Sequence, residues 1–181
     1  ANIEKDFNWI KGHLDEKAKV ENLSENYGLL ALQGPKSEEI LEKLTNVDLD
    51  EINYFHFVED KVADKNTIIS RTGYTGETGF EIYCDSDDLV ELWKKIYETG
   101  QEFGLKPAGL GARNTLRLEK KLCLYGNDID EKTNPLEAGL NFAVKLDKKD
   151  FIGKDKLLKV KDDGIDRKLI GFKLIDRGIP R

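Results

Sequence analysis

The sequence predicts an α+β fold in which helices pack on antiparallel sheets. Three apolar stretches, residues 27–33, 67–70 and 80–84, have strand length and end at glycines or polar turns. Two further stretches, 35–44 and 86–103, repeat apolar residues at the spacing of a helix face. The predicted order is helix, strand, strand, helix, strand, strand, strand, helix. This order is typical of the α+β class, and a split βαβ, ferredoxin-like arrangement is the natural candidate.

The amino end predicts a short helix and then a short strand. The helix is indicated by one apolar stripe, made of Ile3, Phe7, Ile10 and Leu14. Asn2 can cap its start, and Gly12 weakens its end. Residues 19–23 are a plausible short strand.

The first long strand meets its helix at a glycine–proline turn. Tyr27–Gln33 is an apolar run that Gly34 and Pro35 close. Pro35 suits the first turn of a helix, where its missing N–H costs nothing. The buried face of that helix is predicted to be Ile40, Leu41 and Leu44. Residues 50–59 alternate around Ile52, Tyr54, Phe55 and Phe57, and are predicted as a strand.

The second half of the chain predicts three more helices or helical loops. Ser86, Asp87 and Asp88 put acids in the first turn of a helix, which favours its dipole. The predicted inner stripe of this helix is Leu89, Leu92, Trp93, Ile96 and Phe103. Another helix begins near Ala108, and residues 145–163 predict a solvated helix and loop. Residues 168–174 alternate like a strand.

Composition argues against several function classes. The 181 residues carry a formal net charge of −6, which argues against nucleic-acid binding. No apolar run approaches the roughly 18 residues needed to span a bilayer, so no membrane partner is expected. Cys84 and Cys123 fall in no motif, which indicates a reduced, intracellular setting. His13 and His56 stand alone, so no metal site is expected.

The two ends predict a piece of a longer protein. The sequence contains no Met, and Ala1 lies inside the first helical pattern. A strand at residues 168–174 would lie near the end of the chain without its hairpin partner, leaving an unpaired edge. We therefore expect an excised middle piece.

A glycine-rich stretch at residues 71–82 is the strongest candidate for a functional site. Gly73, Gly76 and Gly79 are spaced three apart and lead into a strand that carries Glu81. Such glycines let the backbone turn and approach a ligand closely. From these residues alone, a hairpin loop with a solvent-facing glutamate is the simpler interpretation. The pattern is not a phosphate loop, because no Lys-Ser/Thr follows; an acidic loop with an aromatic suits a donor-rich ring better.

Two arginines, Arg113 and Arg117, are four residues apart and share a helix face. They repel unless something anionic lies between them. In one interpretation Glu119, or a distant carboxylate, pairs them. In the other, an arginine near the helix start holds a carboxylate or an electron-rich ring edge of a ligand. The sequence leaves both interpretations open.

Six motifs in one order resemble the aminomethyltransferase family of the glycine cleavage system, the T-proteins. They are Ala31-Leu32-Gln33-Gly34-Pro35, Arg71-Thr72-Gly73-Tyr74-Thr75-Gly76-Glu77 with Phe80-Glu81-Ile82, Gly111-Ala112-Arg113, Leu116-Arg117-Leu118-Glu119, Tyr125-Gly126-Asn127-Asp128-Ile129 and Pro135-Leu136-Glu137-Ala138-Gly139-Leu140. The resemblance implies transfer of an aminomethyl group from the lipoylated H-protein to tetrahydrofolate, giving 5,10-methylenetetrahydrofolate and ammonia. It also implies residues 1–140 as a partial, central folate-binding α+β region and 141–181 as a linker and the start of a carboxyl-terminal β-barrel domain.

The same resemblance implies that Glu81, Arg113 and Tyr74 contact the folate. It implies no catalytic residue within this chain, since the family's aspartate at folate N5 would lie before Ala1 and a folate-contacting tyrosine beyond Arg181. The chain departs from the family at Asn114, usually Asp, and at Phe142, frequently Trp. A fragment with half a site is expected to be inactive alone.

Other functions stay open at this stage. Related folate domains occur in dimethylglycine and sarcosine dehydrogenases, in folate-dependent demethylases and in a folate-binding accessory protein of iron–sulfur assembly. The accessory protein characteristically keeps a cysteine motif where this chain has residues 135–140 and Phe151-Ile152-Gly153-Lys154, and no such Cys is present. A structural or interaction module without a ligand is a further alternative. The expected location is the cytoplasm for a bacterial protein and the mitochondrion for a eukaryotic one.

Overall fold

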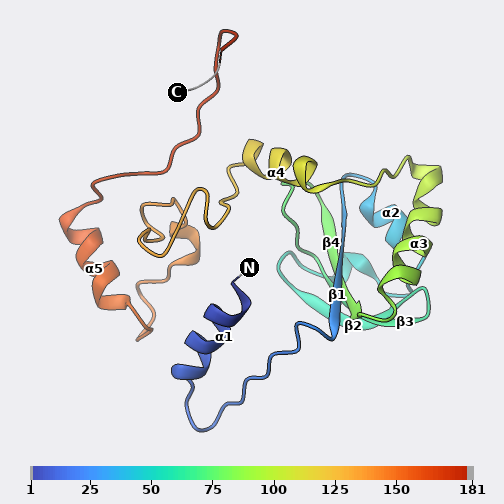
Figure 1. The fold of residues 1–181 in the computed structure, drawn as a ribbon, viewed down its shortest axis with the longest axis horizontal. Coiled ribbons are helices and arrows are strands. Elements are labelled where there is room, and N and C mark those ends of the chain that lie inside the picture. Colours follow the sequence, from blue (N-terminus) through green and yellow to red (C-terminus); the bar gives the residue numbers. More distant parts are fainter. Residues whose placement is uncertain (1, 179–181) are drawn as a thin grey trace. The chain divides into compact units, whose positions relative to one another are not determined.

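A computed structural model describes residues 2–178 (Figure 1). The chain termini, Ala1 and Arg181, lie outside the described residues. The elements in chain order are α1 (Ile3–Gly12), β1 (Tyr27–Gln33), α2 (Ser37–Leu41), η1 (Leu49–Glu51), β2 (Phe57–Val62), β3 (Lys65–Ser70), β4 (Gly79–Asp85), α3 (Leu89–Gly100), η2 (Gln101–Phe103), α4 (Leu110–Glu119), η3 (Asn141–Ala143) and α5 (Lys154–Asp163).

The chain forms two compact units, residues 1–113 and 114–181, and each is described by itself. The first unit contains the sheet, and the second contains η3, α5 and the loops around them. The predicted domains, 1–140 and 141–181, stay a prediction for the complete protein.

Within residues 2–178 the strands form one sheet in the order β1-β4-β3-β2, with every neighbouring pair antiparallel. Figure 1 shows α2 and α3 together on one side of this sheet. The α+β class with helices packed on an antiparallel sheet is therefore confirmed. The strands that α2 joins, β1 and β2, lie at opposite edges of the sheet.

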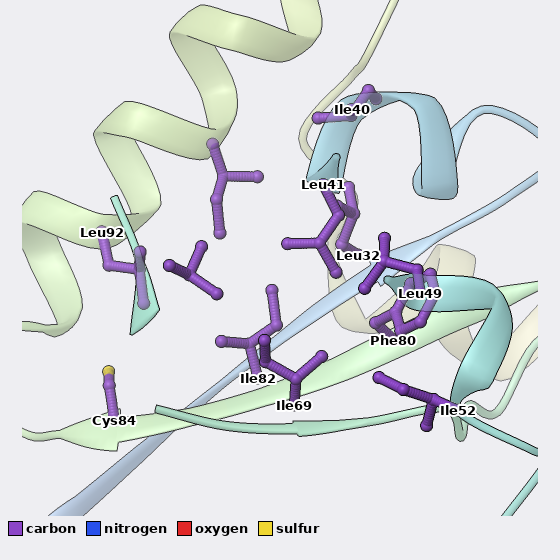
Figure 2. Packing of buried hydrophobic residues seen from close by; sticks show 12 residues of the cluster. Leu32, Ile40, Leu41, Leu49, Ile52, Ile69, Phe80, Ile82, Cys84 and Leu92 are labelled. Atoms are coloured by element: carbon purple, nitrogen blue, oxygen red, sulfur yellow. The ribbon is translucent and has the colours of Figure 1, made fainter. Parts of the chain in front are cut away.

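The core lies between the sheet and these two helices. Phe80, Ile82 and Cys84 alternate along β4 and are almost fully buried. Figure 2 shows Leu92 of α3 and Leu41 of α2 near Ile82 and the other apolar strand side chains. Alternation with a period of two gives each strand one apolar face, and burying that face is the main stabilising contribution. The predicted helix residues Ile40, Leu41 and Ile96 are buried as expected, and Leu44 is packed at the edge of the core.

The opposite face of the sheet, here called the open face, carries the residues that alternate with the core. In register across it lie Ala31 of β1, Glu81 of β4 and Ser70 of β3. Leu29 and Tyr83 form the next row. Leu29 is exposed and Tyr83 half-buried, so this face is partly apolar as well as acidic.

Several local predictions are wrong for identifiable reasons. No strand forms at residues 19–23, where Asn22 Oδ1 accepts the Ser24 amide in a local turn that competes with strand pairing. Residues 50–56 are not a strand, because the Asp48 side chain caps η1 and Phe55 takes a positive φ of 65°. The predicted strand covers only the start of β2.

Four smaller differences concern the helices and the carboxyl segment. The helix α2 begins at Ser37, so Pro35 lies in the turn before it rather than in its first turn. Asn2 makes no side-chain cap to α1, and Trp93 is exposed and stacked on Tyr97 instead of facing the core. Residues 168–174 form no strand. Helices α1, α4 and α5 match their predictions within a few residues, and none of residues 154–163 is buried.

Candidate functional site

The glycine-rich loop, residues 71–78, connects β3 to β4 and is fixed at its base by Arg71. The Arg71 Nη2 donates to Glu38 Oε1 and to the Leu49 carbonyl, each at 2.5 Å. Its guanidinium also lies 4.9 Å from the ring centroid of Phe80, within cation–π range. Phe80 immediately precedes Glu81, so one arginine fastens the start of the loop to the strand that carries the candidate carboxylate.

Glu81 lies on the open face of the sheet, between two strands. Its neighbours in register are Ala31 and Ser70. Its Oε2 accepts a hydrogen bond of 2.5 Å from the Thr72 hydroxyl, at the start of the same loop. The side chain is half-buried, and the Thr72 hydroxyl satisfies only part of what a carboxylate can accept.

The charge of Glu81 affects the pKa of Tyr83, its neighbour on the open face. Burial raises the pKa of the Tyr83 hydroxyl, and the nearby Glu81 charge raises this pKa further. Both causes disfavour the tyrosinate anion. Tyr83 and Glu81 therefore lie close enough on this face for the charge of the carboxylate to act on the tyrosine hydroxyl.

Arg113 and Tyr74 form the second part of the candidate site. The Arg113 guanidinium lies 4.6 Å from the centroid of the Tyr74 ring. Tyr74 is half-buried in the loop, whereas Arg113 is exposed on the first turns of α4. A cation over an aromatic face is attracted by the ring quadrupole, and the planar guanidinium can stack in this way while still donating from its edge.

Arg117 has a different role from Arg113. It is buried, and its Nη1 forms an ion pair with Asp128 and donates to the Leu122 carbonyl at 3.2 Å. Its Nε donates to Asn114 Oδ1 at 2.8 Å. The carboxylate partner is thus Asp128 rather than Glu119. Pairing by a distant carboxylate is therefore confirmed for Arg117. Arg113 contacts the Tyr74 ring, and its role toward a ligand stays a prediction.

The structure therefore joins Tyr74 to Arg113 directly and connects Glu81 to the same loop through Thr72. The sequence interpretation did not single out Thr72. The motif Arg71-Thr72-Gly73 contained the signal, because a hydroxyl two residues after β3 can reach the strand that returns beside it. Of the two family departures, Asn114 accepts a hydrogen bond from Arg117 with its neutral amide oxygen, and Phe142 is exposed.

Among residues 2–178, no group of three or more His, Cys, Asp and Glu side chains is placed to hold a metal ion. None of the helices in the described part of the chain is long and apolar enough to cross a membrane.

Comparison with known proteins gives consistent matches. Residues 1–148 match the GCVT N-terminal domain family. An aminomethyltransferase of Halothermothrix orenii is 57% identical over 181 residues, covering 100% of this chain and 51% of that protein. An aminomethyltransferase of Bacteroides thetaiotaomicron is 54% identical over 183 residues, covering 100% of this chain and 51% of that protein. The chain spans about half the length of these curated relatives.

A solved structure agrees with the sequence matches. The crystal structure of the glycine cleavage system aminomethyltransferase T from Bartonella henselae is 32% identical, with a TM-score of 0.78. The similarity covers 90% of this chain and 44% of that one.

The fold and the side-chain cluster define an α+β domain with a polar candidate site beside the open face of an antiparallel sheet. The comparisons identify the family of this domain: the chain belongs to the GCVT N-terminal domain family.

Proposed function

We propose that the complete protein is the aminomethyltransferase of a glycine cleavage system. The supporting observation is the identity of 57% to a protein of that name across the whole of this chain. In the proposed reaction the aminomethyl carbon leaves the lipoyl sulfur of the H-protein and bonds to tetrahydrofolate. The products are 5,10-methylenetetrahydrofolate, ammonia and the dihydrolipoyl arm. The lipoylated H-protein is thus the proposed protein partner and tetrahydrofolate the second substrate, and the proposed location is the cytoplasm.

Glu81 is proposed to bind the pterin ring of tetrahydrofolate. The pterin edge presents an amino group and a ring N–H, two donors that one carboxylate can accept together. Thr72 supports this role because its hydrogen bond to Oε2 restricts the rotation of the carboxylate. Leaving either pterin donor buried and unpaired would cost about 1–3 kcal/mol, so the carboxylate gives specificity as well as affinity.

Tyr74 and Arg113 are proposed to bind a face and an acceptor-rich edge of the same folate. Their mutual contact of 4.6 Å supports a joint role, because the guanidinium orients the ring and the ring restrains the guanidinium. Arg113 then supplies charge-assisted donors to a carbonyl or ring edge of the ligand. These three side chains include no evident general acid or base, so their proposed contribution is to orient folate N5 toward the aminomethyl carbon.

The experiment is tetrahydrofolate binding by calorimetry on the complete gene product, followed by turnover with aminomethyl-loaded H-protein. Binding that is abolished by Glu81→Ala and by Arg113→Ala, together with turnover in the parent protein, is the expected result. Glu59→Gln is a matched control, because Glu59 also alternates onto the open face but lies on β2, away from the loop. A protein that binds folate without turnover would instead be an accessory folate-binding protein. A protein that does not bind folate would share only its fold with the aminomethyltransferases.

A further inference from the structure

Gln33, the last residue of β1, is held inside the bend of the glycine-rich loop. It pairs in register with Gly79, two residues before Glu81, and alternates onto the same face of the sheet as Ala31. Its side chain is half-buried. Gln33 lies at the edge strand, outside the loop in sequence, yet its amide reaches three residues of the loop and of β4.

The side-chain amide of Gln33 makes hydrogen bonds through both its nitrogen and its oxygen. Nε2 donates to the Thr72 carbonyl at 3.2 Å and to the Phe80 carbonyl at 3.3 Å. Oε1 accepts from the Thr75 hydroxyl at 3.1 Å, and Thr75 is buried. Two carbonyls on one side and a hydroxyl on the other are complementary to a primary amide in one orientation only.

Gly73 of the loop and Gly79 of β4 leave room for this amide. A Cβ at Gly73 would lie 1.9 Å from Gln33 Oε1, and a Cβ at Gly79 would lie 2.4 Å from the Gln33 Nε2. Neither glycine has a positive φ, in contrast to Gly76 at 74°. Gly73 and Gly79 are therefore required by the close approach of Gln33, whereas Gly76 meets a backbone requirement.

These contacts bracket the residues of the proposed folate site. Thr72 and Thr75 lie on either side of Tyr74, and Thr72 is also the residue that binds Glu81. Phe80 immediately precedes Glu81 on β4. A single amide thus fixes the backbone before Tyr74, the side chain after it, and the strand position next to the carboxylate.

We propose that Gln33 is a positioning residue that sets the distance between Tyr74 and Glu81 for the folate ring. This inference rests on the proposed function for its ligand, but its geometric basis is independent of that function. Gln33 does not act on the ligand itself. It acts by holding the loop in one conformation, so that the ring-facing tyrosine and the ring-edge carboxylate are preorganised before the ligand binds.

The first test replaces the amide in the complete gene product. Gln33→Met keeps the side-chain length and removes every hydrogen bond. Gln33→Glu keeps an acceptor for Thr75 but sets a carboxylate against the carbonyls of Thr72 and Phe80. Both variants are expected to raise the KM for tetrahydrofolate by about tenfold or more and to leave the KM for aminomethyl-loaded H-protein unchanged. A role in stability alone would lower the melting temperature without separating the two KM values.

The second test is a double-mutant cycle between the amide and the glycine. Gly73→Ala is expected to weaken tetrahydrofolate binding and to speed hydrogen exchange of the amides in residues 72–78, because the new methyl displaces the Gln33 amide. In the Gln33→Ala background the same methyl has room, so Gly73→Ala is expected to cause little further loss. The control is Gly12→Ala, since a Cβ at Gly12 meets nothing within 4 Å and its φ is ordinary.

The outcomes separate this inference from the proposed function. If the parent protein binds tetrahydrofolate and the two Gln33 variants bind it equally well, the inference is overturned while the proposed function stands. If no form binds tetrahydrofolate, the proposed function fails, and with it the ligand assigned to Gln33. Hydrogen exchange of residues 72–78 then still decides whether Gln33 fixes the loop. Purely additive effects of Gly73→Ala and Gln33→Ala on that exchange would show that it does not.

Discussion

The hydroxyl of Thr72 donates a 2.5 Å hydrogen bond to Oε2 of Glu81, across the gap between the loop and β4. The two residues are nine apart in sequence, and most of the glycine-rich loop lies between them. The bond holds a half-buried carboxylate in one rotamer on the open face of the sheet. It follows that the orientation of Glu81 depends on the conformation of the loop, and that both can be tested by one substitution.

Thr72→Val is expected to weaken tetrahydrofolate binding by about fivefold to tenfold, because it removes a charge-assisted hydrogen bond but keeps the branched shape. Calorimetry on the complete gene product measures the change. Thr72→Ser is the matched control, since it retains the hydroxyl and is expected to bind nearly as well as the parent. Equal affinity for the Val and Ser variants would show that the hydrogen bond does not orient Glu81 for the ligand.

Glu81→Gln is expected to lower the pKa of Tyr83. Burial is the larger cause of the raised pKa, so the value should fall only part of the way toward that of a free tyrosine. Titration of the tyrosine ring carbons by NMR measures it directly. Glu59→Gln serves as the comparison, and a Tyr83 pKa that is unchanged by Glu81→Gln would contradict the placement of the Glu81 charge on this face.

Alternation and spacing predicted the central strands and the helix faces of the first unit. Residues 67–70 and 80–84 are strands, and the spacing of Leu92 and Ile96 located the inner face of α3. The same alternation wrongly predicted a strand at residues 50–56, where apolar residues alternate across a capped turn. A pattern with a period of two reports which residues are apolar, but it does not report that the Asp48 side chain caps a helical turn at residues 49–51.

The sequence named Tyr74, Glu81 and Arg113 as candidate site residues, but it did not predict their contacts. The sequence put Arg113 and Arg117 on one helix face without separating their roles. That separation depends on Asp128, eleven residues beyond Arg117, and on the distant Tyr74 ring. Similarly, Gln33 is 40 residues before Gly73 in the sequence, so no local spacing connects the amide with the glycine that makes room for it.

Asp128→Asn is expected to destabilise the second unit by about 3 kcal/mol, because it leaves the buried Arg117 without its countercharge. Asp128 Oδ2 also accepts the Leu124 amide at 3.0 Å, so the loop at residues 122–128 should loosen together with the ion pair. Denaturant unfolding and hydrogen exchange of that loop measure both effects. Asp147→Asn is the control, since Asp147 is exposed. A loss below about 0.5 kcal/mol would mean that the pair contributes little.

Asn114→Asp is expected to stabilise the protein modestly, by up to about 1 kcal/mol, because it converts the 2.8 Å hydrogen bond from Arg117 Nε into an ion pair. The measurement is the melting temperature at low and at high salt. The gain should shrink as salt screens the pair. A decrease in melting temperature would indicate that Asp128 already neutralises Arg117 and that a second carboxylate repels the first.

Acid is expected to destabilise the second unit through a cluster around Arg167. A hydrogen bond from Arg167 is the main cause that lowers the pKa of Glu137, with a further contribution from the backbone N–H of Asn134. Hydrogen bonds from Thr133 and from the Lys132 amide lower the pKa of Asp130. A carboxyl whose pKa is lower in the folded state stabilises that state above its unfolded pKa, and the contribution is lost as pH falls through the folded value.

The free energy of unfolding is therefore expected to begin falling below about pH 4.5, the ordinary pKa of a glutamate such as Glu137. The fall continues below pH 3.8, the ordinary pKa of an aspartate such as Asp130. Glu137→Gln should flatten the fall in the free energy of unfolding between pH 5 and pH 3, because the variant has no proton to gain at that position. Glu119→Gln, at an exposed position on α4, controls for the loss of one negative charge. Denaturant unfolding followed at several pH values measures the slope, and an equal slope for Glu137→Gln and the parent protein would rule out Glu137 as its source.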